Sequence, residues 1–344
     1  MRIIIIGFGV VGQSFVRILL SKSAELYSTF GLNPRVVACV DSSGMAQSHS
    51  GMDLGRLLDA KRTKKSVSAY HGNNGTCLKT NDLIENTEAE VMIEATPTNL
   101  EKAEPGISHI MSALKTKKHV ITVNKGPMAL AFSSLLELSR YNNVKLAFSG
   151  TVGGGTPILE FAKKCLRGDR IISFKGILNG TTNYILSKME EDRLSFLQAL
   201  TIAKQKGYAE AAPELDIEGY DAAAKLVIMA NWVMERKVSI SDVSRHGISD
   251  VDSNMVRNAA EKGKAIRLIA YCDSNELKVM PLEISRSDPI CVTGTLNAVT
   301  FTSEYSGEKT VVGRGAGGLE TASAVLRDLI EIRDSISFSS DSKV

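Results

Sequence analysis

The sequence predicts an α/β protein with two parts, a doubly wound parallel sheet and a second α+β domain with a mixed sheet. Three observations support this prediction. The chain begins with a β-branched run, a glycine-rich turn and a helical pattern in direct succession. Strand-like and helical patterns then alternate up to about residue 150. Beyond that point a glycine-rich loop leads into further apolar runs, which suggest a mixed sheet with helices.

The composition is that of a well-cored chain without a strongly charged surface. Its 344 residues are enough for about two domains, and 43% of them are hydrophobic. The net charge is +3, and the charges are dispersed apart from the short basic run KRTKK at 61–65. A nucleic-acid-binding surface needs basic residues gathered on one face, so we expect no nucleic-acid partner.

Cysteine usage and the N-terminus both predict a cytoplasmic protein. The cysteines are far apart, odd in number and without a CxxC pair: Cys39, Cys77, Cys165, Cys272 and Cys291. They indicate buried or free thiols in a reducing compartment rather than disulfides or a zinc site. The apolar N-terminal run is too short to span a membrane and lacks a signal-peptide cleavage pattern, so no membrane association is expected.

The first strand and the turn after it predict a Rossmann-type dinucleotide site. RIIII at 2–6 is typical of a strand buried on both faces, and QSFVRILLSKS beyond the turn has helical periodicity. Gly7 permits the tight turn, Gly9 lets the backbone approach a pyrophosphate, and Gly12 allows helix and strand to pack closely. The alternative is a glycine turn in another kind of α/β protein. The cofactor-binding residues predicted from the motif GFGVVG are Gly7, Phe8, Gly9, Val10, Val11 and Gly12.

The second strand favours a nicotinamide cofactor. RVVACV at 35–40 ends in Asp41. An acid in this place accepts hydrogen bonds from the adenine-side ribose hydroxyls, which favours NAD. Asp41 and the adjacent Ser42 are therefore predicted to contact the cofactor.

Polar or turn-forming stretches follow two later strands of the same domain. Strands are predicted at 90–95, 119–124 and 144–149, and helices around 106–116 and 128–140. Ligands of open α/β sheets bind at the carboxyl ends of the strands. The stretches TPTN and NKGP lie at two such ends, so Thr96, Pro97 and Asn124 are predicted cofactor contacts. Lys125 points toward the nicotinamide end; its alternative is a solvated loop lysine.

The regular alternation of strand and helix patterns ends at residue 150, where a glycine-rich loop begins. We place the boundary of the nucleotide-binding domain there. The loop TVGGGTP at 151–157 caps a helix at 157–166, binds a cation through its carbonyls or serves as a hinge. Strands are expected at 171–178 and in the runs KAIRLIAYC and KVMPLEI, and NGTTN opens a helix. The second domain is predicted to span 151–309.

The stretch 207–225, GYAEAAPELDIEGYDAAAK, concentrates acidic and basic side chains before an apolar helix. From about residue 219 the apolar residues recur at helical spacing, which places Asp221 and Lys225 on one stripe. By spacing alone the pair is a surface ion pair worth about 0.2–0.5 kcal/mol, or else it lies at the mouth of a cleft. Glu210 and Asp216 in the preceding loop are solvated acids or cation-binding carboxylates.

Seven motifs, taken in order, resemble homoserine dehydrogenase in its short form without a regulatory domain. The resemblance runs across nearly the whole chain and both domains. It implies the NAD(P)-linked interconversion of L-homoserine and L-aspartate 4-semialdehyde, on the branch toward threonine and methionine. The motifs are GFGVVG at 7–12, EATPTNLE at 94–101, HVITVNKGP at 119–127, GTVGGGTP at 150–157, GILNGTTNYIL at 176–186, GYAE through DAAAK at 207–225, and GRGAGGLETASAVLRDL at 313–329.

The resemblance also implies roles for single residues. Lys125 and Lys225 match the catalytic lysines, which stabilise and protonate the substrate oxygen, and Asp221 matches the acid that orients Lys225. Glu210 matches the residue that holds the α-ammonium of the substrate, since an unpaired ammonium in a closed site is costly. The remaining implied substrate contacts are Asp216, Gly180, Thr181 and Tyr208.

The C-terminal motif is expected to return to the cofactor. In the family it supplies glycines that allow close backbone approach, here Gly315 with Ala316 beside it. A helix at 319–332 then packs on the first domain, so residues 310–344 are expected to complete the nucleotide-binding domain. The family also implies a homodimer, formed through the sheet of the second domain, which makes 151–309 the substrate and dimerisation domain.

The cation site departs from the family pattern. The TVGGG loop of the family often binds sodium through carbonyls, with help from a glutamate two residues before the threonine. That position is Ser149 here, so the charge is absent. The candidate ligands are the carbonyls of Val152, Gly154 and Thr156.

Cofactor choice stays open at this stage. Asp41 favours NAD, whereas Ser42, Ser43 and the basic run at 61–65 would accept the 2′-phosphate of NADP. Both NAD and NADP are therefore carried as the expected cofactor.

Two other functions compete with the one that the resemblance implies. The first is a related dehydrogenase acting on another amino-acid aldehyde or alcohol, because the length of the substrate cannot be read from the sequence. The second is a non-catalytic NAD(H)-sensing protein. Such a sensor would need neither the Asp221–Lys225 pair nor a substrate carboxylate.

Overall fold

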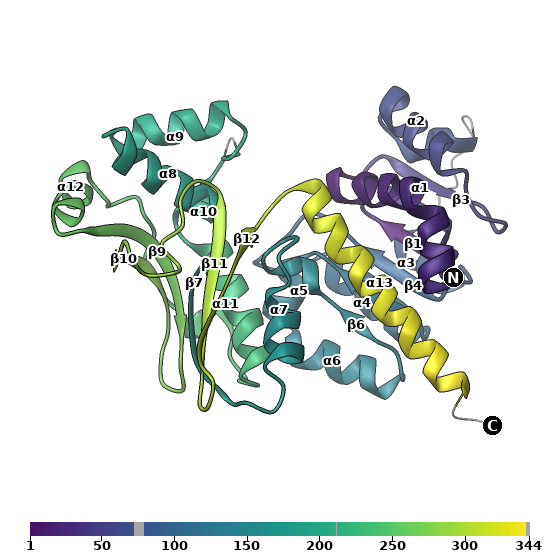
Figure 1. The fold of residues 1–344 in the computed structure, drawn as a ribbon. Helices are drawn as coiled ribbons and strands as arrows, with labels where there is room; N and C mark the ends of the chain where they lie inside the picture. The colour runs from purple at the N-terminus through teal and green to yellow at the C-terminus, as the bar shows by residue number, and fades with distance from the viewer. Residues whose placement is uncertain (72–78, 211, 342–344) are drawn as a thin grey trace. The chain divides into compact units, whose positions relative to one another are not determined.

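The chain folds into two compact units. The computed structural model describes residues 1–71, 79–210 and 212–341. Unit 1 comprises Met1–Thr151 and Gly317–Val344, and unit 2 comprises Val152–Ala316. Figure 1 shows the elements of both units. Cys77, one of the predicted thiols, lies outside the described residues.

Unit 1 is built on a six-stranded sheet with the order β3-β2-β1-β4-β5-β6. The pairs β1–β2, β1–β4, β4–β5 and β5–β6 are parallel, which confirms the predicted parallel sheet. The edge strand β3 pairs antiparallel with β2 and was not predicted. The strands are β1 (Arg2–Ile6), β2 (Arg35–Asp41), β3 (Gly44–Gln47), β4 (Val91–Glu94), β5 (His119–Thr122) and β6 (Leu146–Ala147).

Two long helices from opposite ends of the chain cover one face of this sheet. The first, α1 (Val10–Phe30), packs against the last, α13 (Gly318–Asp341), and the two run side by side in Figure 1. Side chains of both helices share one core with Ile3 and Ile5 of β1. Ile4 and Ile6 point to the other face, because strand side chains alternate, and they are also buried.

The other helical elements of unit 1 connect the strands. They are α2 (Leu54–Lys64), the 3₁₀ helix η1 (Val67–His71), α3 (Thr80–Asn86), α4 (Gly106–Lys115), α5 (Lys125–Leu130), α6 (Phe132–Tyr141) and the 3₁₀ turn η2 (Ser149–Thr151).

Two predicted elements of unit 1 differ from the structure. The single helix expected at 128–140 is divided into α5 and α6, because Ala131 between them leaves the helical conformation with φ −135° and ψ 29°. The strand expected at 144–149 is reduced to the two residues of β6. It ends early because the N–H and the hydroxyl of Ser149 bind the carboxylate of Asp328 on α13 instead of a strand.

Unit 2 holds a mixed six-stranded sheet in the order β12-β11-β7-β9-β10-β8. Its neighbours are antiparallel except for the short parallel pair β10–β8, in agreement with the predicted mixed sheet. The strands are β7 (Ile171–Ile177), β8 (Ser244–Arg245), β9 (Lys264–Cys272), β10 (Leu277–Ser285), β11 (Leu296–Ser303) and β12 (Gly307–Arg314).

The helices of unit 2 pack on this sheet, and one of them is buried on every side. Residues 222–231 of α11 (Tyr220–Val233) are all buried, although the sequence predicted a single apolar face. The helix follows Gly219, whose positive φ of 78° a glycine adopts without strain. The other helical elements are α7 (Ile158–Glu160), the π-helical turn η3 (Phe161–Cys165), α8 (Gly180–Glu191), α9 (Phe196–Gln205), α10 (Glu214–Ile217), the 3₁₀ turn η4 (Ile240–Asp242) and α12 (Ser253–Glu261).

Candidate functional site

The glycine turn between β1 and α1 has the shape of a phosphate-binding loop. Gly7 has φ 99°, and a Cβ there would lie 2.4 Å from the carbonyl of Ala95. A Cβ at Gly12 would lie 2.5 Å from the carbonyl oxygen of Gly7, so both positions require glycine. A Cβ at Gly9 would meet nothing within 4 Å. Open space at Gly9, directly before the helix start, leaves room for a pyrophosphate at the positive end of α1.

The apolar residues of the turn divide into buried and exposed ones. Phe8 is buried in the core of unit 1, and its carbonyl accepts a hydrogen bond from the amide of Gln13 at 3.3 Å. Val10 is exposed and Val11 is half-buried. Of these residues, only Val10 therefore presents its side chain to a ligand that lies along the helix start.

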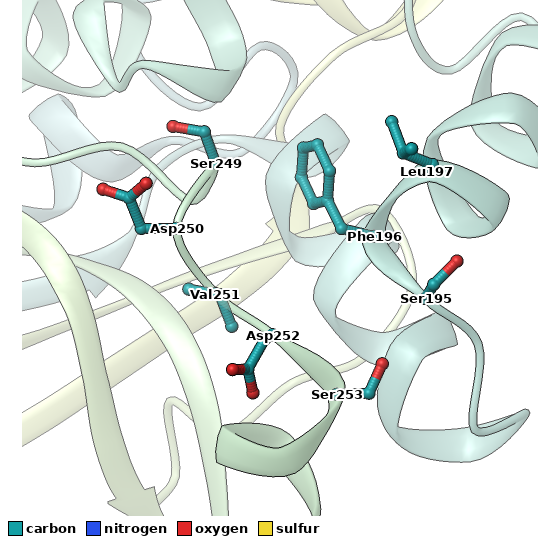
Figure 2. Close-up of a pocket in the computed structure, with 8 residues that line it drawn as sticks. All are labelled: Ser195, Phe196, Leu197, Ser249, Asp250, Val251, Asp252 and Ser253. Carbon is teal, nitrogen blue, oxygen red and sulfur yellow. The ribbon is translucent and has the colours of Figure 1, made fainter.

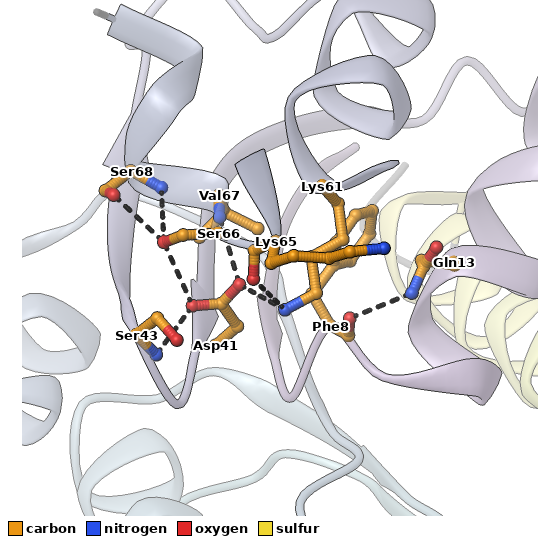
Figure 3. Close-up of polar contacts among 9 residues, drawn as sticks. All are labelled: Phe8, Gln13, Asp41, Ser43, Lys61, Lys65, Ser66, Val67 and Ser68. Atoms are coloured by element: carbon orange, nitrogen blue, oxygen red, sulfur yellow. Dashed lines mark hydrogen bonds and ion pairs between the residues drawn. The ribbon is translucent and has the colours of Figure 1, made fainter. Parts of the chain in front are cut away.

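Asp41 is the last residue of β2, and its carboxylate accepts hydrogen bonds from other groups of the protein (Figure 3). Its Oδ2 accepts hydrogen bonds from Nζ of Lys61 at 2.6 Å and from the N–H of Val67 at 2.9 Å. Its Oδ1 accepts from the N–H of Ser43 at 2.8 Å. The side chain of Asp41 is only 3% exposed. The acid that the sequence predicted is thus in place, but Lys61 compensates its charge. The neighbouring Ser42 is exposed in the turn to β3.

The ends of β4 and β5 come together through side-chain hydrogen bonds. The amide of Asn124 donates to Oγ1 of Thr96 at 3.2 Å and to the carbonyl of Pro97 at 3.3 Å. Its oxygen accepts the N–H of Gly126 at 3.1 Å and so caps α5. Lys125 is the first residue of that helix and is half-buried. The structure therefore joins Thr96, Pro97 and Asn124 in one cluster and places Lys125 directly beside it.

In unit 2, a buried ammonium and two carboxylates form the strongest concentration of charge among the predicted residues. Nζ of Lys225 lies 2.6 Å from Oδ2 of Asp221 and 2.7 Å from the carbonyl oxygen of Leu178. The side chains of Lys225 and Asp221 are 9% and 14% exposed. A solvated i,i+4 ion pair on a helix surface is therefore ruled out as the interpretation of this pair.

Asn179 links this pair to Asp216, and sequence reasoning did not single it out. Its amide nitrogen donates to Oδ1 of Asp216 at 2.7 Å and to Oδ2 of Asp221 at 2.9 Å. Its amide oxygen accepts the N–H of Thr182 at 2.9 Å and caps α8. In the sequence, Asn179 lies between a predicted strand and a predicted helix. An asparagine in that place indicates a helix N-cap, but it gives no sign of contacts with distant acids.

The two acids influence each other. Burial raises the pKa of Asp216, and the nearby Asp221 carboxylate raises it further. The hydrogen bond from Asn179 opposes this shift, as do the charge of Lys225 and the hydroxyl of Thr181. Asn179 thus donates to two carboxylates whose charges repel, and it favours the ionised form of Asp216.

Of the other predicted substrate residues, Gly180 and Thr181 begin α8, and Tyr208 contacts this helix start. A Cβ at Gly180 would lie 2.7 Å from the carbonyl oxygen of Thr295, so the backbones pass closely. The hydroxyl of Thr181 donates to the carbonyl of Tyr208 at 2.8 Å. Glu210 is exposed in the loop between α9 and α10. No hydrogen bond within the described residues connects Glu210 to the cluster of Asp216, Asp221 and Lys225.

The loop at 151–157 packs on the segment that follows β12, within unit 2. The hydroxyl of Thr156 donates to the carbonyl of Arg314 at 3.2 Å. A Cβ at Gly154 would lie 2.9 Å from the carbonyl oxygen of Gly315. Ala316 is exposed at the end of this unit. Glycines on both segments therefore allow two backbones to touch.

This loop fits a cation incompletely. The carbonyl of Thr156 accepts the N–H of Ile158 at 2.8 Å, so one candidate ligand already has a partner. Among the described residues there is no group of three or more acidic, histidine or cysteine side chains that would hold a metal. Ser149, at the position where the resemblance implies a glutamate, binds Asp328 within unit 1.

A separate open pocket of about 430 Å³ in unit 2 contains none of the predicted site residues (Figure 2). It lies between the start of α9 and the segment before α12. One of its two carboxylates, that of Asp252, caps α12 by accepting the N–H groups of Asn254 and Met255. Its lining is Ser195, Phe196, Leu197, Ser249, Asp250, Val251, Asp252 and Ser253.

In the part of the chain that the structure describes, no helix combines the length and the apolarity that crossing a bilayer requires.

Comparison with known proteins identifies the family. Residues 7–149 match the homoserine dehydrogenase NAD-binding domain, and residues 157–330 match homoserine dehydrogenase. The chain is 42% identical over 338 residues to a homoserine dehydrogenase of Methanocaldococcus jannaschii, covering 97% of this chain and 99% of that one. It is 36% identical over 342 residues to an NAD(+)-dependent homoserine dehydrogenase of Pseudomonas canavaninivorans, covering 97% and 96%.

A solved structure agrees. A hyperthermophilic archaeal homoserine dehydrogenase in complex with NADPH superimposes with a TM-score of 0.83 and 28% identity, covering 96% of this chain and 97% of that one. The family, the near-complete coverage and the matching fold point to the same enzyme class. The chain therefore belongs to the homoserine dehydrogenase family, whose members are nicotinamide-dependent enzymes.

Proposed function

We propose that this enzyme interconverts L-homoserine and L-aspartate 4-semialdehyde, on the branch toward threonine and methionine. The observation that carries the proposal is the buried cluster of Lys225, Asp221 and Asp216. An amino-acid aldehyde needs a proton donor at its oxygen and a counter-charge for its ammonium group. This cluster offers both kinds of group.

Lys225 is assigned to the substrate oxygen. An ammonium has three N–H bonds, and Asp221 with the carbonyl of Leu178 accounts for two of them. The third N–H would donate to the aldehyde oxygen, on which negative charge develops as hydride reaches the carbon. In the reverse direction, neutral Lys225 would take the hydroxyl proton of homoserine. Asp221 holds the lysine in position for both directions.

Asp216, with Glu210 from the adjoining loop, is assigned to the α-ammonium of the substrate. Asn179 keeps Asp216 pointing into the same cluster as Asp221, since one amide bonds both acids. Gly180, Thr181 and the backbone of Tyr208 would form the rest of the pocket around the start of α8. The exposure of Glu210 leaves its carboxylate accessible to a substrate that enters from solvent.

Unit 1 is assigned to the cofactor, which supplies or accepts the hydride when it is bound. The glycine turn would hold the pyrophosphate, and Thr96, Pro97 and Asn124 would contact the nicotinamide end. We assign the second proton-transfer role to Lys125, and its position directly after Asn124 supports that role. Gly315 and Ala316 are assigned to the cofactor through the family resemblance.

We propose that both NAD and NADP are accepted. An unpaired acid at the end of β2 would repel the 2′-phosphate of NADP, but the ammonium of Lys61 compensates Asp41 here. Ser42 and Ser43 would add donors for ribose or phosphate. Among relatives, one is described as NAD(+)-dependent and another is solved with NADPH, which supports a family able to use either.

No step of this mechanism requires a cation. The candidate ligands are the carbonyls of Val152, Gly154 and Thr156. The glutamate that would assist them in the family is replaced by Ser149, and the Thr156 carbonyl already accepts a hydrogen bond.

We further propose a cytoplasmic homodimer, joined through the unit 2 sheet as in the family. The cysteine pattern of the sequence supports a reducing compartment, because the cysteines are odd in number and far apart, without a CxxC pair.

The test is oxidation of L-homoserine, followed by the absorbance of reduced nicotinamide with NAD and NADP side by side. L-Serine and the amino alcohol with one more carbon than homoserine are run in parallel. We expect homoserine to have the highest kcat/KM with both cofactors. Faster turnover of a shorter or longer amino alcohol would establish the related-dehydrogenase alternative. Cofactor binding without turnover of any of them would establish a non-catalytic sensor.

A further inference from the structure

A buried acid and a buried histidine in unit 1 have no role in the mechanism above. Glu94 is the last residue of β4 and is 0% exposed, and His109 on α4 is 6% exposed. Nδ1 of His109 lies 3.8 Å from Oε1 of Glu94, which is within ion-pair range but beyond a hydrogen bond. Oε2 of Glu94 and Nδ1 of His109 have no hydrogen-bond partner among the described residues.

A pair of this kind is costly to keep. A buried polar atom without a partner destabilises the folded state, and more so when the group is charged. An apolar pair of similar volume would avoid that cost and would fill the space between β4 and α4 equally well. The unpartnered atoms therefore call for an explanation, and a functional role is one that the surrounding contacts support.

Glu94 ends a directed chain of hydrogen bonds. Its Oε1 accepts the N–H of Thr96 at 3.0 Å and also the hydroxyl of Thr96. Because that hydroxyl donates to Glu94, its lone pairs remain for the amide of Asn124, which donates to it at 3.2 Å. The amide oxygen of Asn124 is then left to cap α5, the helix that begins with Lys125.

The helix α4 connects both ends of this chain. A Cβ at Gly106 would lie 2.6 Å from the amide nitrogen of Asn124, so only glycine leaves room for that amide. His109 follows three residues later and therefore lies on the same face of α4, against Glu94. One helix thus sets the position of Asn124 and the surroundings of Glu94.

We propose that Glu94 and His109 are a positioning pair for the nicotinamide end of the cofactor. They fix the direction of the Thr96 hydroxyl, and through it the Asn124 amide and the first turn of α5. This inference rests on the proposed function, which assigns Thr96 and Asn124 to the nicotinamide. The pair acts through these residues and does not itself touch the cofactor.

The chain offers a matched control in a buried ion pair with closed contacts. In unit 2, Nη1 of Arg267 lies 2.8 Å from Oε2 of Glu190, and the two side chains are 1% and 8% exposed. Glu190 also bonds Arg286. None of these three residues belongs to the predicted site. Glu190→Gln therefore removes a buried charge without touching the hydrogen-bond chain of unit 1.

The experiment compares Glu94→Met, which removes the acceptor oxygens, His109→Leu and the control Glu190→Gln with the wild type. The dissociation constants of NADH and NADPH are measured by fluorescence, and those of ADP-ribose and its 2′-phosphate by calorimetry. These two fragments carry the adenosine half and lack nicotinamide. We expect Glu94→Met and His109→Leu to weaken binding of the reduced cofactor about tenfold, or about 1.4 kcal/mol, and to leave fragment binding within about twofold.

The melting temperatures and dissociation constants together test the positioning role of Glu94 and His109. Glu190→Gln is expected to lower the melting temperature and to leave both dissociation constants unchanged. Equal weakening of cofactor and fragment in Glu94→Met, or no weakening at all, overturns the positioning role. If Glu94→Met does not fold, His109→Leu carries the same test, because it removes the other member of the pair and leaves Thr96 and Asn124 unchanged. A wild type that binds neither cofactor nor fragment contradicts the proposed function instead.

Discussion

Unit 1 holds its predicted ligand site mainly through backbone, whereas unit 2 holds its site through charged side chains. In unit 1 the decisive residues are glycines whose missing Cβ atoms make room, at Gly7, Gly9 and Gly12. In unit 2 the decisive groups are the ammonium of Lys225 and the carboxylates of Asp216 and Asp221.

The difference follows from what each unit is proposed to bind. A pyrophosphate is recognised by N–H groups at a helix start, and every residue type can supply those if the backbone comes close enough. A proton donor must be one ionisable group with its own counter-charge, so its neighbours have to be specific side chains. Substitutions are therefore expected to act through shape in unit 1 and through charge in unit 2.

The largest expected effect is removal of the counter-charge in unit 2. Asp221→Ala leaves the ammonium of Lys225 buried without its acid, so we expect the free energy of unfolding to fall by about 3 kcal/mol. Turnover of homoserine is expected to fall at least about a hundredfold. Chemical denaturation and steady-state kinetics measure the two effects.

Glu191→Ala is the control for that prediction, because it removes one of the two acid partners of Lys188 at the surface of α8. Its effect on unfolding is expected to stay below about 1 kcal/mol. Equal destabilisation by the two alanine variants would mean that the Asp221–Lys225 pair is no more than a surface ion pair.

Two glycine variants test the role of shape in unit 1. Gly7→Ala places a Cβ 2.4 Å from the Ala95 carbonyl at a positive φ, so we expect loss of stability and of cofactor binding. Gly9→Ala meets open space, so its melting temperature should be unchanged, while its cofactor dissociation constant rises about tenfold. Calorimetry gives both quantities. Unchanged cofactor affinity in Gly9→Ala would remove the pyrophosphate from this turn.

Asn179 tests whether the charges of unit 2 depend on one neutral amide. Its hydrogen bond lowers the pKa of Asp216, so its loss raises that pKa further. In the proposed function Asp216 binds the substrate ammonium, which requires the ionised carboxylate, so the acid limb of the kcat/KM profile for homoserine should move to higher pH. We expect this shift with about a tenfold loss of kcat/KM in Asn179→Leu.

Asn179→Asp separates the bridge from the helix cap. An aspartate still accepts the N–H of Thr182 and caps α8, but it cannot donate to Asp216 or Asp221. The acid limb should shift in this variant too, although the cap is intact. An acid limb that coincides with the wild type in both variants would show that Asn179 only caps α8.

The smallest expected effect concerns cofactor choice. Lys61→Ala leaves Asp41 without its compensating ammonium, so the acid should repel the 2′-phosphate of NADP. We expect kcat/KM with NADP to fall about fivefold relative to that with NAD, which is about 1 kcal/mol. Kinetics with both cofactors at fixed ionic strength measure the ratio. A ratio that rises instead would mean that Asp41 does not face the 2′-position.

Much of unit 1 could be predicted because its signals are local. The run at 2–6 is a strand, the glycines follow it directly, and the helix starts where the pattern indicates. The break at Ala131 had no local signal, since an alanine is normally the best helix former. The early end of β6 depends on Asp328, which lies 179 residues away from Ser149 in the chain.

The site in unit 2 was predicted only in part, because it depends on contacts between residues that are distant in the sequence. Helical spacing placed Asp221 and Lys225 together, but it did not show that α11 is buried on all sides. Asn179 contacts Asp216 and Asp221, which follow it in the sequence by 37 and 42 positions. No short motif encodes contacts between residues so far apart. In unit 1, the contact between Asp41 and Lys61 was likewise outside the reach of periodicity.

The most direct test of the central claim measures turnover and cofactor binding in Lys225→Ala and Lys225→Met. The claim is that Lys225 transfers the proton while unit 1 holds the cofactor. It predicts that homoserine oxidation falls about a thousandfold in both variants, while the dissociation constant of the reduced cofactor stays within about twofold. Turnover within tenfold of the wild type in either variant, with cofactor binding intact, would contradict it.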